Sequence, residues 1–367
     1  AWEAKKEGPE PGIQALWDRG EPSPAYVYRR GDPNQPTTLV GPGVPSVLTD
    51  GKTPFPAQPP WPGAKKTGRR LAFARWLTRP DHPLTARVMV NRIWKHHCGT
   101  GIVPTLANFG KTGAAPTHPE LLDWLAMEFA NPSEPGGEPW KIKRIHRLIM
   151  TSATYRQSSA VTPGLQSADP TNALHSRARL VRLDAEALYD AMLMVSGRLD
   201  ETPGGPADAV KARADGLVTP VGSSKGWRRL VYAQQTRKQP ASHAELFDFP
   251  QMNPNCVERR DSTVATQALH LLNNGMVAQL AGELAKRVEE EAGEDPAKQV
   301  MALYMRALSR PPTETERDLT LQAIIDLRSA WERQGGPAQV DRAASRLKAL
   351  TTVCHAILNS AAFLHID

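Results

Sequence analysis

Hydrophobic residues recur at helical spacing through most of the chain after residue 68. In the segment 141–157, Ile142, Ile145, Leu148 and Ile149 share one face of a helix with 3.6 residues per turn. Comparable patterns predict further helices at 69–78, 85–97, 117–129, 184–199, 262–291, 296–309, 313–334 and 338–360. The segments 117–120 and 313–316 have the Thr-x-x-Glu spacing of a capping box, which marks the start of a helix.

The first 63 residues have a different character. They hold 13 of the 33 prolines, and proline removes a backbone donor and fixes φ, so this segment cannot be mainly helical. Apolar and aromatic residues at 25–30 predict a short strand that ends in the turn 31–33. A second short strand is expected at 229–233. We therefore expect an extended, proline-rich arm at the N-terminal end.

The predicted fold class is mainly α. We expect an irregular multi-helix domain with the Pro-rich arm and one or two short β-strands. The arm should span 1–63 and the helical domain 64–367, the latter with sub-parts 64–200 and 227–367 joined by a loop at 201–226. That loop is rich in Gly, Pro, Ala and Asp, and the segment 243–255 is expected to be irregular.

Charge is distributed unevenly along the chain. The net charge is +7, and the segment 65–111 holds ten basic residues against one acid, whereas 281–334 holds eleven acids against eight bases. A basic surface attracts polyanions, although arginines can equally be paired with internal carboxylates. Nucleic acid is not expected as a partner, because no nucleic-acid-binding motif is present. No run of 18 apolar residues occurs, so we expect no membrane span.

Cysteine and histidine spacings give little sign of a metal or cofactor. Cys98, Cys256 and Cys354 lie far apart, so one disulfide is possible but free thiols are favoured. The pair His96–His97 and the pair His118 and Glu120 are the only suggestive metal spacings, and neither is typical of a metal site. No Gly-rich nucleotide-binding motif occurs, and we therefore expect no metal and no cofactor.

The helix at 85–97 carries the first candidate site. Arg87, Asn91 and either Trp94 or Lys95 are spaced so that they share one helix face. A guanidinium, an amide and an indole ring together can bind an anionic or hydroxylated ligand. The same residues could instead form a buried polar network that ties the helix to neighbouring loops.

A second candidate group begins at residue 182. Arg182, Asp184 and Glu186 lie where a helix starts, and two acids there could bind a ligand, act as general acid and base, or pair with arginines. Cys256 lies close to Arg259, so it is either an activated nucleophile, with His243 or His270 as base, or a packed thiol. The amides of Gln267, Asn273 and Asn274 either bind backbone or face a pocket.

Longer motifs resemble a known family. They include Gly68–Leu77, His82–Trp94, Pro116–Ala126, Ile149–Ser158, Arg182–Glu186, Gln267–Asn273, Ala307–Pro312 and Leu358–Leu364. These motifs are similar to the planctomycete-type secreted domain of unknown function, over roughly residues 24–367. Cys98 departs from the family pattern, which usually has an aromatic residue there, and this puts only local packing in doubt.

The resemblance implies export from a bacterial cell, to the periplasm or beyond. It also implies upstream domains in the same polypeptide, commonly a cytochrome-c-like module and another helical domain, as partners. The N-terminal sequence lacks the apolar core of a signal peptide, so the chain is either cytosolic or a trimmed piece of a longer protein. Genes of the family often lie near polysaccharide-degrading enzymes.

Two functions are then open. The first is a binding or scaffold module for an anionic ligand such as a sulfated or acidic polysaccharide. The second is a catalytic or electron-transfer-associated component of an exported polysaccharide-degrading system. The second predicts a deep pocket where Arg87, Asn91 and some of Asp184, Glu186 and Cys256 converge.

Overall fold

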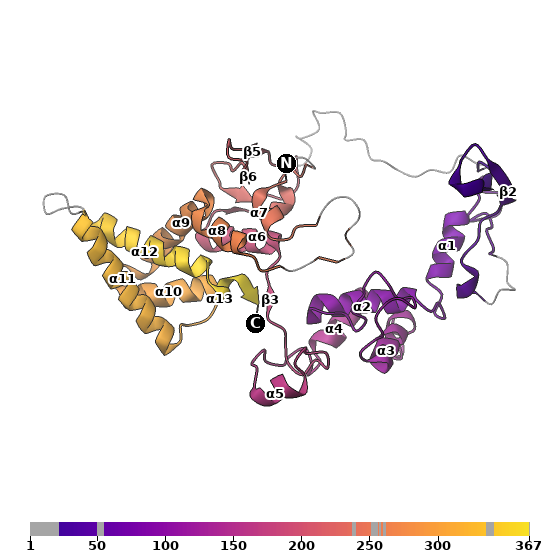
Figure 1. Ribbon diagram of the computed structural model, residues 1–367, viewed down its shortest axis with the longest axis horizontal. Coiled ribbons are helices and arrows are strands. Elements are labelled where there is room, and N and C mark those ends of the chain that lie inside the picture. The colour runs from indigo at the N-terminus through magenta and orange to yellow at the C-terminus, as the bar shows by residue number, and fades with distance from the viewer. Residues whose placement is uncertain are drawn as a thin grey trace. The chain divides into compact units, whose positions relative to one another are not determined.

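The computed structural model describes residues 22–49, 55–236, 240–250, 256, 258–259, 262–334 and 341–366. The chain divides into two compact units, unit 1 (Ala1–Tyr155) and unit 2 (Arg156–Asp367). Across the described residues helices dominate and all strands are short, which confirms the mainly α fold (Figure 1). The division expected from the sequence, at residue 63 and around the loop 201–226, stays a prediction.

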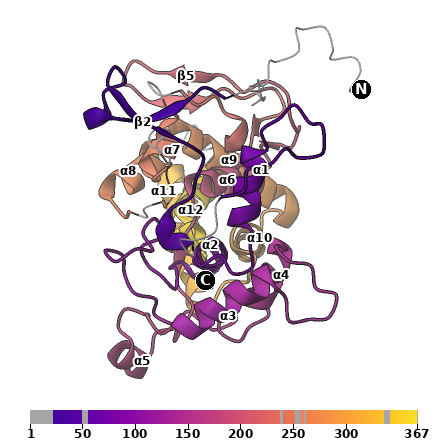
Figure 2. The same ribbon diagram turned by 90° about the vertical axis from the view of Figure 1, so that its right-hand side faces the viewer.

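In the part of unit 1 that the structure describes, there are one strand pair and four α-helices. These are β1 (Ala25–Tyr28), β2 (Pro36–Val40), α1 (Arg69–Leu77), α2 (Thr85–Cys98), α3 (Pro119–Ala130) and α4 (Ile142–Met150). The helices α2, α3 and α4 pack on one another around a common apolar core (Figure 2). Val90 of α2, Leu125 of α3 and Ile145 of α4 are almost fully buried in it. The apolar residues that recur at helical spacing in the sequence are therefore those that pack into the core.

Two predicted helix ends in unit 1 differ from the structure. The helix α4 ends at Met150 rather than near residue 157, because the hydroxyls of Thr151 and Ser152 donate to the carbonyls of Arg147 and Ile149 and end the helical pattern. The expected capping box at 117–120 is wrong, since the Thr117 hydroxyl donates to the Ile102 carbonyl instead.

The strand expected at 25–30 is present as β1, which ends at Tyr28, and it forms a hairpin with β2. Strands β1 and β2 pair antiparallel, and every residue in both is exposed. Downstream, the arm meets the start of α1 at Gly68, whose φ is +69°. A Cβ atom at Gly68 would lie 1.8 Å from the carbonyl oxygen of Gln58, so only glycine permits this contact. The arm is thereby held against α1.

Unit 2 contains the remaining elements. Its helices are α5 (Pro163–Ala168), α6 (Ala185–Ser196), α7 (Ser242–Leu246), α8 (Ala265–Asn273), α9 (Gly275–Ala292), α10 (Pro296–Leu308), α11 (Glu314–Gln334), α12 (Arg342–Leu358) and α13 (Ala361–Leu364). Its strands are β3 (Val181–Arg182), β4 (Leu199–Asp200), β5 (Val210–Ala212), β6 (Val218–Pro220), β7 (Trp227–Arg228) and β8 (His365–Ile366).

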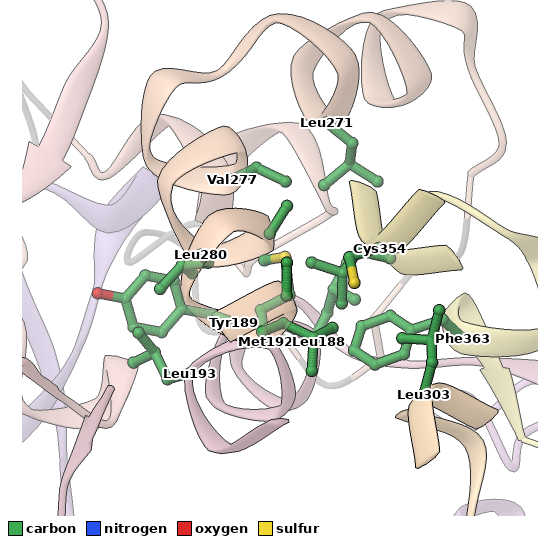
Figure 3. Close-up of a cluster of buried hydrophobic side chains, with 14 of the residues drawn as sticks. Leu188, Tyr189, Met192, Leu193, Leu271, Val277, Leu280, Leu303, Cys354 and Phe363 are labelled. Carbon is green, nitrogen blue, oxygen red and sulfur yellow. The ribbon is translucent and has the colours of Figure 1, made fainter. Parts of the chain in front are cut away.

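The core of unit 2 lies around α9, which packs against α6, α10 and α12. Leu188 and Leu193 of α6, Leu280 of α9 and Cys354 of α12 are fully buried in this cluster (Figure 3). In the described part of unit 2 the strands form three small pairs, of which β3–β8 and β5–β6 are antiparallel and β4–β7 is parallel. No helix among the described residues is long and apolar enough to cross a membrane.

Four sequence expectations for unit 2 are corrected by the structure. The segment 262–291 is two helices, because the Asn274 side chain accepts a hydrogen bond from the Met276 amide and caps a new helix there. The expected loop 201–226 contains the hairpin β5–β6, and the expected strand 229–233 is a 3-10 turn at Leu230–Tyr232. The segment expected to be irregular from 243 begins with the short helix α7.

The second capping box is confirmed. The Glu316 amide donates to the Thr313 hydroxyl over 3.2 Å, and the Thr313 amide donates to the Glu316 carboxylate over 2.8 Å. Arg310 donates both of its terminal nitrogens to the same carboxylate at 2.7 Å. The hydrogen bonds from Arg310 hold the pKa of Glu316 at about 2.

Candidate functional site

The first predicted site residue, Arg87, lies at the surface of α2. Its Nε donates to Asp123 of α3 at 2.7 Å, and its Nη1 donates to the Pro83 carbonyl at 2.8 Å. The Arg87 side chain is about one third exposed. Arg87 thus fixes the backbone that leads into α2 while keeping part of its guanidinium accessible.

The other two predicted residues of α2 point inward. Asn91 is fully buried, and its amide exchanges two hydrogen bonds with the Val103 backbone, at 2.9 and 3.0 Å. Trp94 is 5% exposed and belongs to the unit 1 core. Asn91 therefore forms the buried polar link to a loop that the sequence allowed as the alternative. As ligand contacts, Arg87, Asn91 and Trp94 stay predictions.

Unit 1 also contains a large recess, which we call the basic recess, between the arm, α1 and the start of α2. Its volume is about 710 Å3. It is lined by Val44, Val47, Leu48, Thr49, Phe55, Pro56, Gln58, Leu71, Ala72, Arg75, Trp76, Arg79, Asp81, His82 and Pro83. The size is within the range of small-molecule sites.

His82 is the buried polar group of the basic recess. Its Nδ1 accepts from the amides of Leu84 and Thr85, at 3.3 and 3.1 Å, and lies 3.0 Å from the Thr85 hydroxyl. Because backbone amides can only donate, Nδ1 must be the unprotonated nitrogen and Nε2 must carry the hydrogen. His82 is 8% exposed, and its Nε2 has no hydrogen-bond partner among the described residues. Burial also lowers the pKa of His82, so the ring is neutral at neutral pH.

Charged and aromatic groups also line the basic recess. Arg75 is exposed and makes no ion pair with any residue that the structure describes. Arg79 pairs with Asp81 at the rim, where both side chains are more than half exposed. The Trp76 ring stands edge-on to the His82 ring, with centroids 4.5 Å apart. Among the described residues, the lining of the basic recess therefore includes a guanidinium without an ion pair, a neutral imidazole, an indole and one carboxylate.

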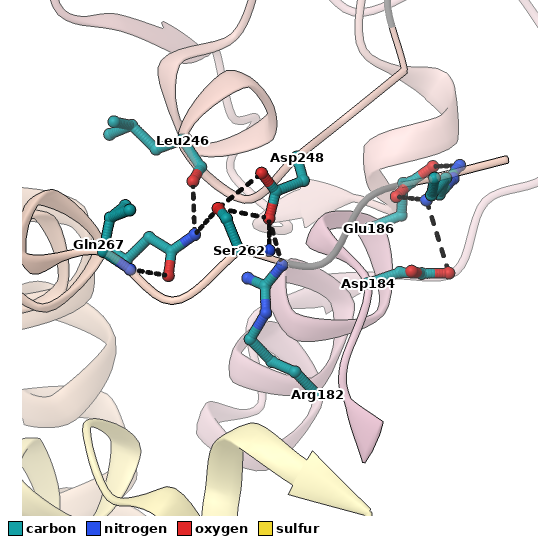
Figure 4. A network of polar contacts seen from close by, with 9 residues as sticks. Arg182, Asp184, Glu186, Leu246, Asp248, Ser262 and Gln267 are labelled. Atoms are coloured by element: carbon teal, nitrogen blue, oxygen red, sulfur yellow. Dashed lines mark hydrogen bonds and ion pairs between the residues drawn. The ribbon is translucent and has the colours of Figure 1, made fainter. Parts of the chain in front are cut away.

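The predicted residue Arg182 lies in unit 2. Its Nη2 donates to the Asp248 carboxylate at 2.6 Å, and its side chain is 7% exposed (Figure 4). Asp248 also accepts from the amide and hydroxyl of Ser262, at 2.9 and 2.7 Å. Gln267 extends this network by donating to the carbonyl of Leu246 at 2.9 Å. The network joins β3 to the segments before and after the 251–261 stretch.

Asp184 and Glu186 meet one arginine. Arg259 donates to both oxygens of Glu186 at 2.7 Å and lies 3.4 Å from Asp184. This forked pair lowers the pKa of Glu186 against the opposing effect of burial. The structure thus assembles the ion pairing that the sequence allowed as one alternative, while a role for Arg182, Asp184 and Glu186 in ligand binding stays a prediction. Arg87 and Asn91 belong to unit 1 and these three to unit 2.

The cysteines and histidines show no sign of a shared centre. All three cysteines are free, with Cys354 buried, Cys98 half-buried and Cys256 exposed. The Cys256 thiol donates to the Glu258 carbonyl. His97 contacts His146, with Nε2 and Nδ1 2.6 Å apart, rather than His96. Among the residues that the structure describes, no group of three His, Cys, Asp or Glu side chains is arranged to hold a metal ion.

Sequence reasoning missed His82 and Trp76 as site residues. Both lie in motifs noted above, but His82 lies in the stretch 79–83, where two prolines indicated only the end of a helix. A usable signal was present, because a histidine just before a helix start can accept from the first free amides of that helix. Arg75 was counted in the basic stretch but was not singled out.

Comparison with known proteins gives a family and no closer relative. No curated protein and no solved structure matches the chain significantly. The model of the family described as PSD1, protein of unknown function (DUF1553), matches residues 69–324. The match covers well over half of the 367 residues and includes α1, α2 and His82. The chain therefore belongs to the PSD1 family (DUF1553), whose function is unknown.

Proposed function

We propose that the basic recess of unit 1 binds the anionic groups of an acidic polysaccharide, sulfated or uronic, outside the cell. The observation that carries this proposal is that two residues lining the recess lack partners among the described residues: the buried Nε2–H of His82 has no acceptor, and Arg75 makes no ion pair. A buried donor left without a partner costs about 1–3 kcal/mol. An oxyanion in the recess would remove that cost.

The two donors suit a sulfate or carboxylate group. Arg75 can offer two parallel N–H groups to a pair of anionic oxygens, and His82 can donate to one of them. The neutral state of His82 also limits how strongly the recess attracts anions, so that Arg75 supplies the main attraction. Asp81 opposes it, but Arg79 neutralises that carboxylate.

The walls of the basic recess suit a sugar ring. Trp76 and Phe55 supply apolar surface, and sites for small ligands combine such surface with a few polar groups. Arg87 donates a hydrogen bond to the carbonyl of Pro83, which lines the recess, and so stabilises the shape of the recess. In this proposal export brings the domain to extracellular polymers, and upstream domains of the same polypeptide would be its partners.

Binding of dextran sulfate tests the proposal, with neutral dextran as the control polymer. The full chain should bind dextran sulfate, more weakly at high salt, and should bind dextran far less, because the interaction is between charges. Arg75→Gln should weaken binding about tenfold or more, as expected when a charge-assisted hydrogen bond is lost.

Arg70→Gln is the matched control for Arg75→Gln. It removes the same charge from the same helix, but Arg70 does not line the basic recess. It should therefore leave the affinity nearly unchanged. Equal losses in the two variants would show attraction by net charge alone and contradict a specific site. Equal binding of dextran and dextran sulfate would contradict the proposal altogether.

A further inference from the structure

Unit 2 buries a tyrosine hydroxyl to which no described residue is hydrogen-bonded. Tyr189 of α6 is 2% exposed, and its hydroxyl has no hydrogen-bond partner among the described residues. Figure 3 shows this oxygen, in red, pointing away from the apolar cluster that surrounds the ring. Burial raises the pKa of Tyr189 well above its usual range, so the hydroxyl keeps its proton. It is a donor and acceptor in need of a partner.

A small cavity of about 20 Å3 lies beside Tyr189. A cavity of this size holds one water molecule or one ligand group of similar size. His243, His270 and Asn274 also line it, together with apolar residues and strand β6. A partner for the Tyr189 hydroxyl that occupied this cavity would therefore be a single small group.

The hydrogen bonds around the cavity define what that group must be. His243 Nε2 lies 3.2 Å from the carbonyl of Ala185 and must donate to it, so Nδ1 of His243 is an acceptor. Asn274 uses its oxygen to accept from Met276, so its Nδ2 donates to His270 Nε2 at 3.2 Å. The polar lining of the cavity thus includes the Tyr189 hydroxyl and two neutral imidazoles. An alcohol hydroxyl suits this lining best, because it both donates and accepts hydrogen bonds.

A wider groove lies next to the cavity. It has a volume of about 520 Å3 and runs along the outer face of α8, past α7 and the turn between β5 and β6. His270 and Asn274 line both the groove and the cavity, so the two are neighbours. A ligand in the groove can therefore present one group to the cavity.

The groove has the chemistry of a site for neutral hydroxyl groups. Its polar lining includes Ser242, Thr266 and Asn273, and Leu269 adds apolar surface. Arg213 pairs with Asp215 at 2.8 Å, so its charge is neutralised, while Glu245 makes no ion pair with any described residue. Among the described lining residues, the groove thus has an unpaired carboxylate and no unpaired cation, which disfavours an anionic ligand.

We infer that unit 2 binds a neutral polyhydroxylated ligand, such as an uncharged sugar, in this groove, with one ligand hydroxyl seated in the cavity between Tyr189 and His243. When no ligand is bound, one water molecule fits in its place. This site rests on different residues from the basic recess and does not depend on the function proposed there.

Saturation-transfer NMR on the full chain tests the inference. The probes are glucose, galactose, mannose, xylose and cellobiose, with glucuronic and galacturonic acid as charged counterparts. At least one neutral sugar should bind, and more tightly than the acids. Tyr189→Phe removes only the hydroxyl and should weaken that binding about tenfold, the effect of one or two lost hydrogen bonds.

Two further variants complete the test. Tyr304→Phe is the matched control, because Tyr304 is also buried in unit 2 but its hydroxyl is paired with Thr320 at 3.2 Å. It should leave sugar binding unchanged. Asn273→Ala alters the groove at an exposed residue and should weaken binding several-fold even if Tyr189→Phe folds poorly. If no neutral sugar binds, or if folded Tyr189→Phe binds as tightly as the wild type, the inference is wrong and the cavity holds water only.

Discussion

Among single residues, His243 should respond most strongly to acid. It is buried, and burial lowers its pKa from 6.5 to about 3. Between these pH values the unfolded chain binds a proton at this position and the folded chain does not. The free energy of unfolding should therefore fall as the pH drops from about 6.5 to about 3, by about 1.4 kcal/mol per pH unit from this residue. Urea unfolding across this range measures the slope.

His243→Gln isolates this contribution. The glutamine amide can still donate to the Ala185 carbonyl but does not titrate. The variant should show a smaller slope of unfolding free energy against pH. Some slope should remain, because burial also lowers the pKa of His82, His97 and His270, and these residues are unchanged in the variant. An identical slope in wild type and variant would show that His243 is not protonated on unfolding in this range.

Individual side-chain roles were the least predictable part of the candidate site. Helical spacing predicted one shared face for Arg87, Asn91 and Trp94, but it did not show that Arg87 lies at the surface while the Asn91 amide is buried and binds Val103. That partner reaches α2 through a loop, and periodicity within one helix has no information about loops. For the same reason the sequence did not predict His82 as a site residue, because the recess that it lines is formed together with the N-terminal arm.

At the scale of elements, the capping box of α11 should contribute measurably to stability. Thr313→Ala removes the acceptor of the Glu316 amide and should lower the free energy of unfolding by about 1 kcal/mol. Because the pKa of Glu316 is lowered from 4.5 to about 2, its own contribution should be complete above pH 4.5 and be lost as the pH falls toward 2. Thr315→Ala replaces an exposed threonine two residues further along the chain, and it should have little effect in the same denaturation experiment. Equal losses would contradict the cap.

The contact between the arm and α1 gives a second prediction for elements. Gly68 and Gly63 both have positive φ, so replacing either by alanine strains the backbone by about 1–2 kcal/mol. Only at Gly68 does the new Cβ collide, with the Gln58 carbonyl. Gly68→Ala should therefore expose 55–63 to proteolysis and weaken dextran sulfate binding, whereas Gly63→Ala should do neither. Intact binding by Gly68→Ala would show that the arm is not needed for the basic recess.

Helix positions were predictable because buried apolar residues recur every three to four residues. Helix boundaries were less so. The predicted helix 262–291 keeps its apolar pattern across Asn274, and only the amide cap there breaks it into α8 and α9. The strands β5 and β6 have three residues each, which is too short for a pattern of alternation to appear.

For the whole molecule, composition and periodicity were sufficient to predict a mainly α protein with a proline-rich arm. They did not show that the basic stretch 65–111 divides into paired and unpaired arginines. Arg79 and Arg87 are paired with carboxylates, whereas Arg75 makes no ion pair with any described residue. Net charge describes long-range attraction, and only the structure shows which guanidinium remains available for a ligand.

The most direct test of the proposed function is the NMR signal of the His82 ring in the full chain. Nitrogen-15 spectra should show His82 with its hydrogen on Nε2, and dextran sulfate should shift that N–H resonance in a saturable way, as expected for a new hydrogen bond. Neutral dextran should leave it unchanged, and Arg75→Gln should require more dextran sulfate for the same shift. A His82 signal that does not respond to dextran sulfate, while the polymer binds, would contradict the account.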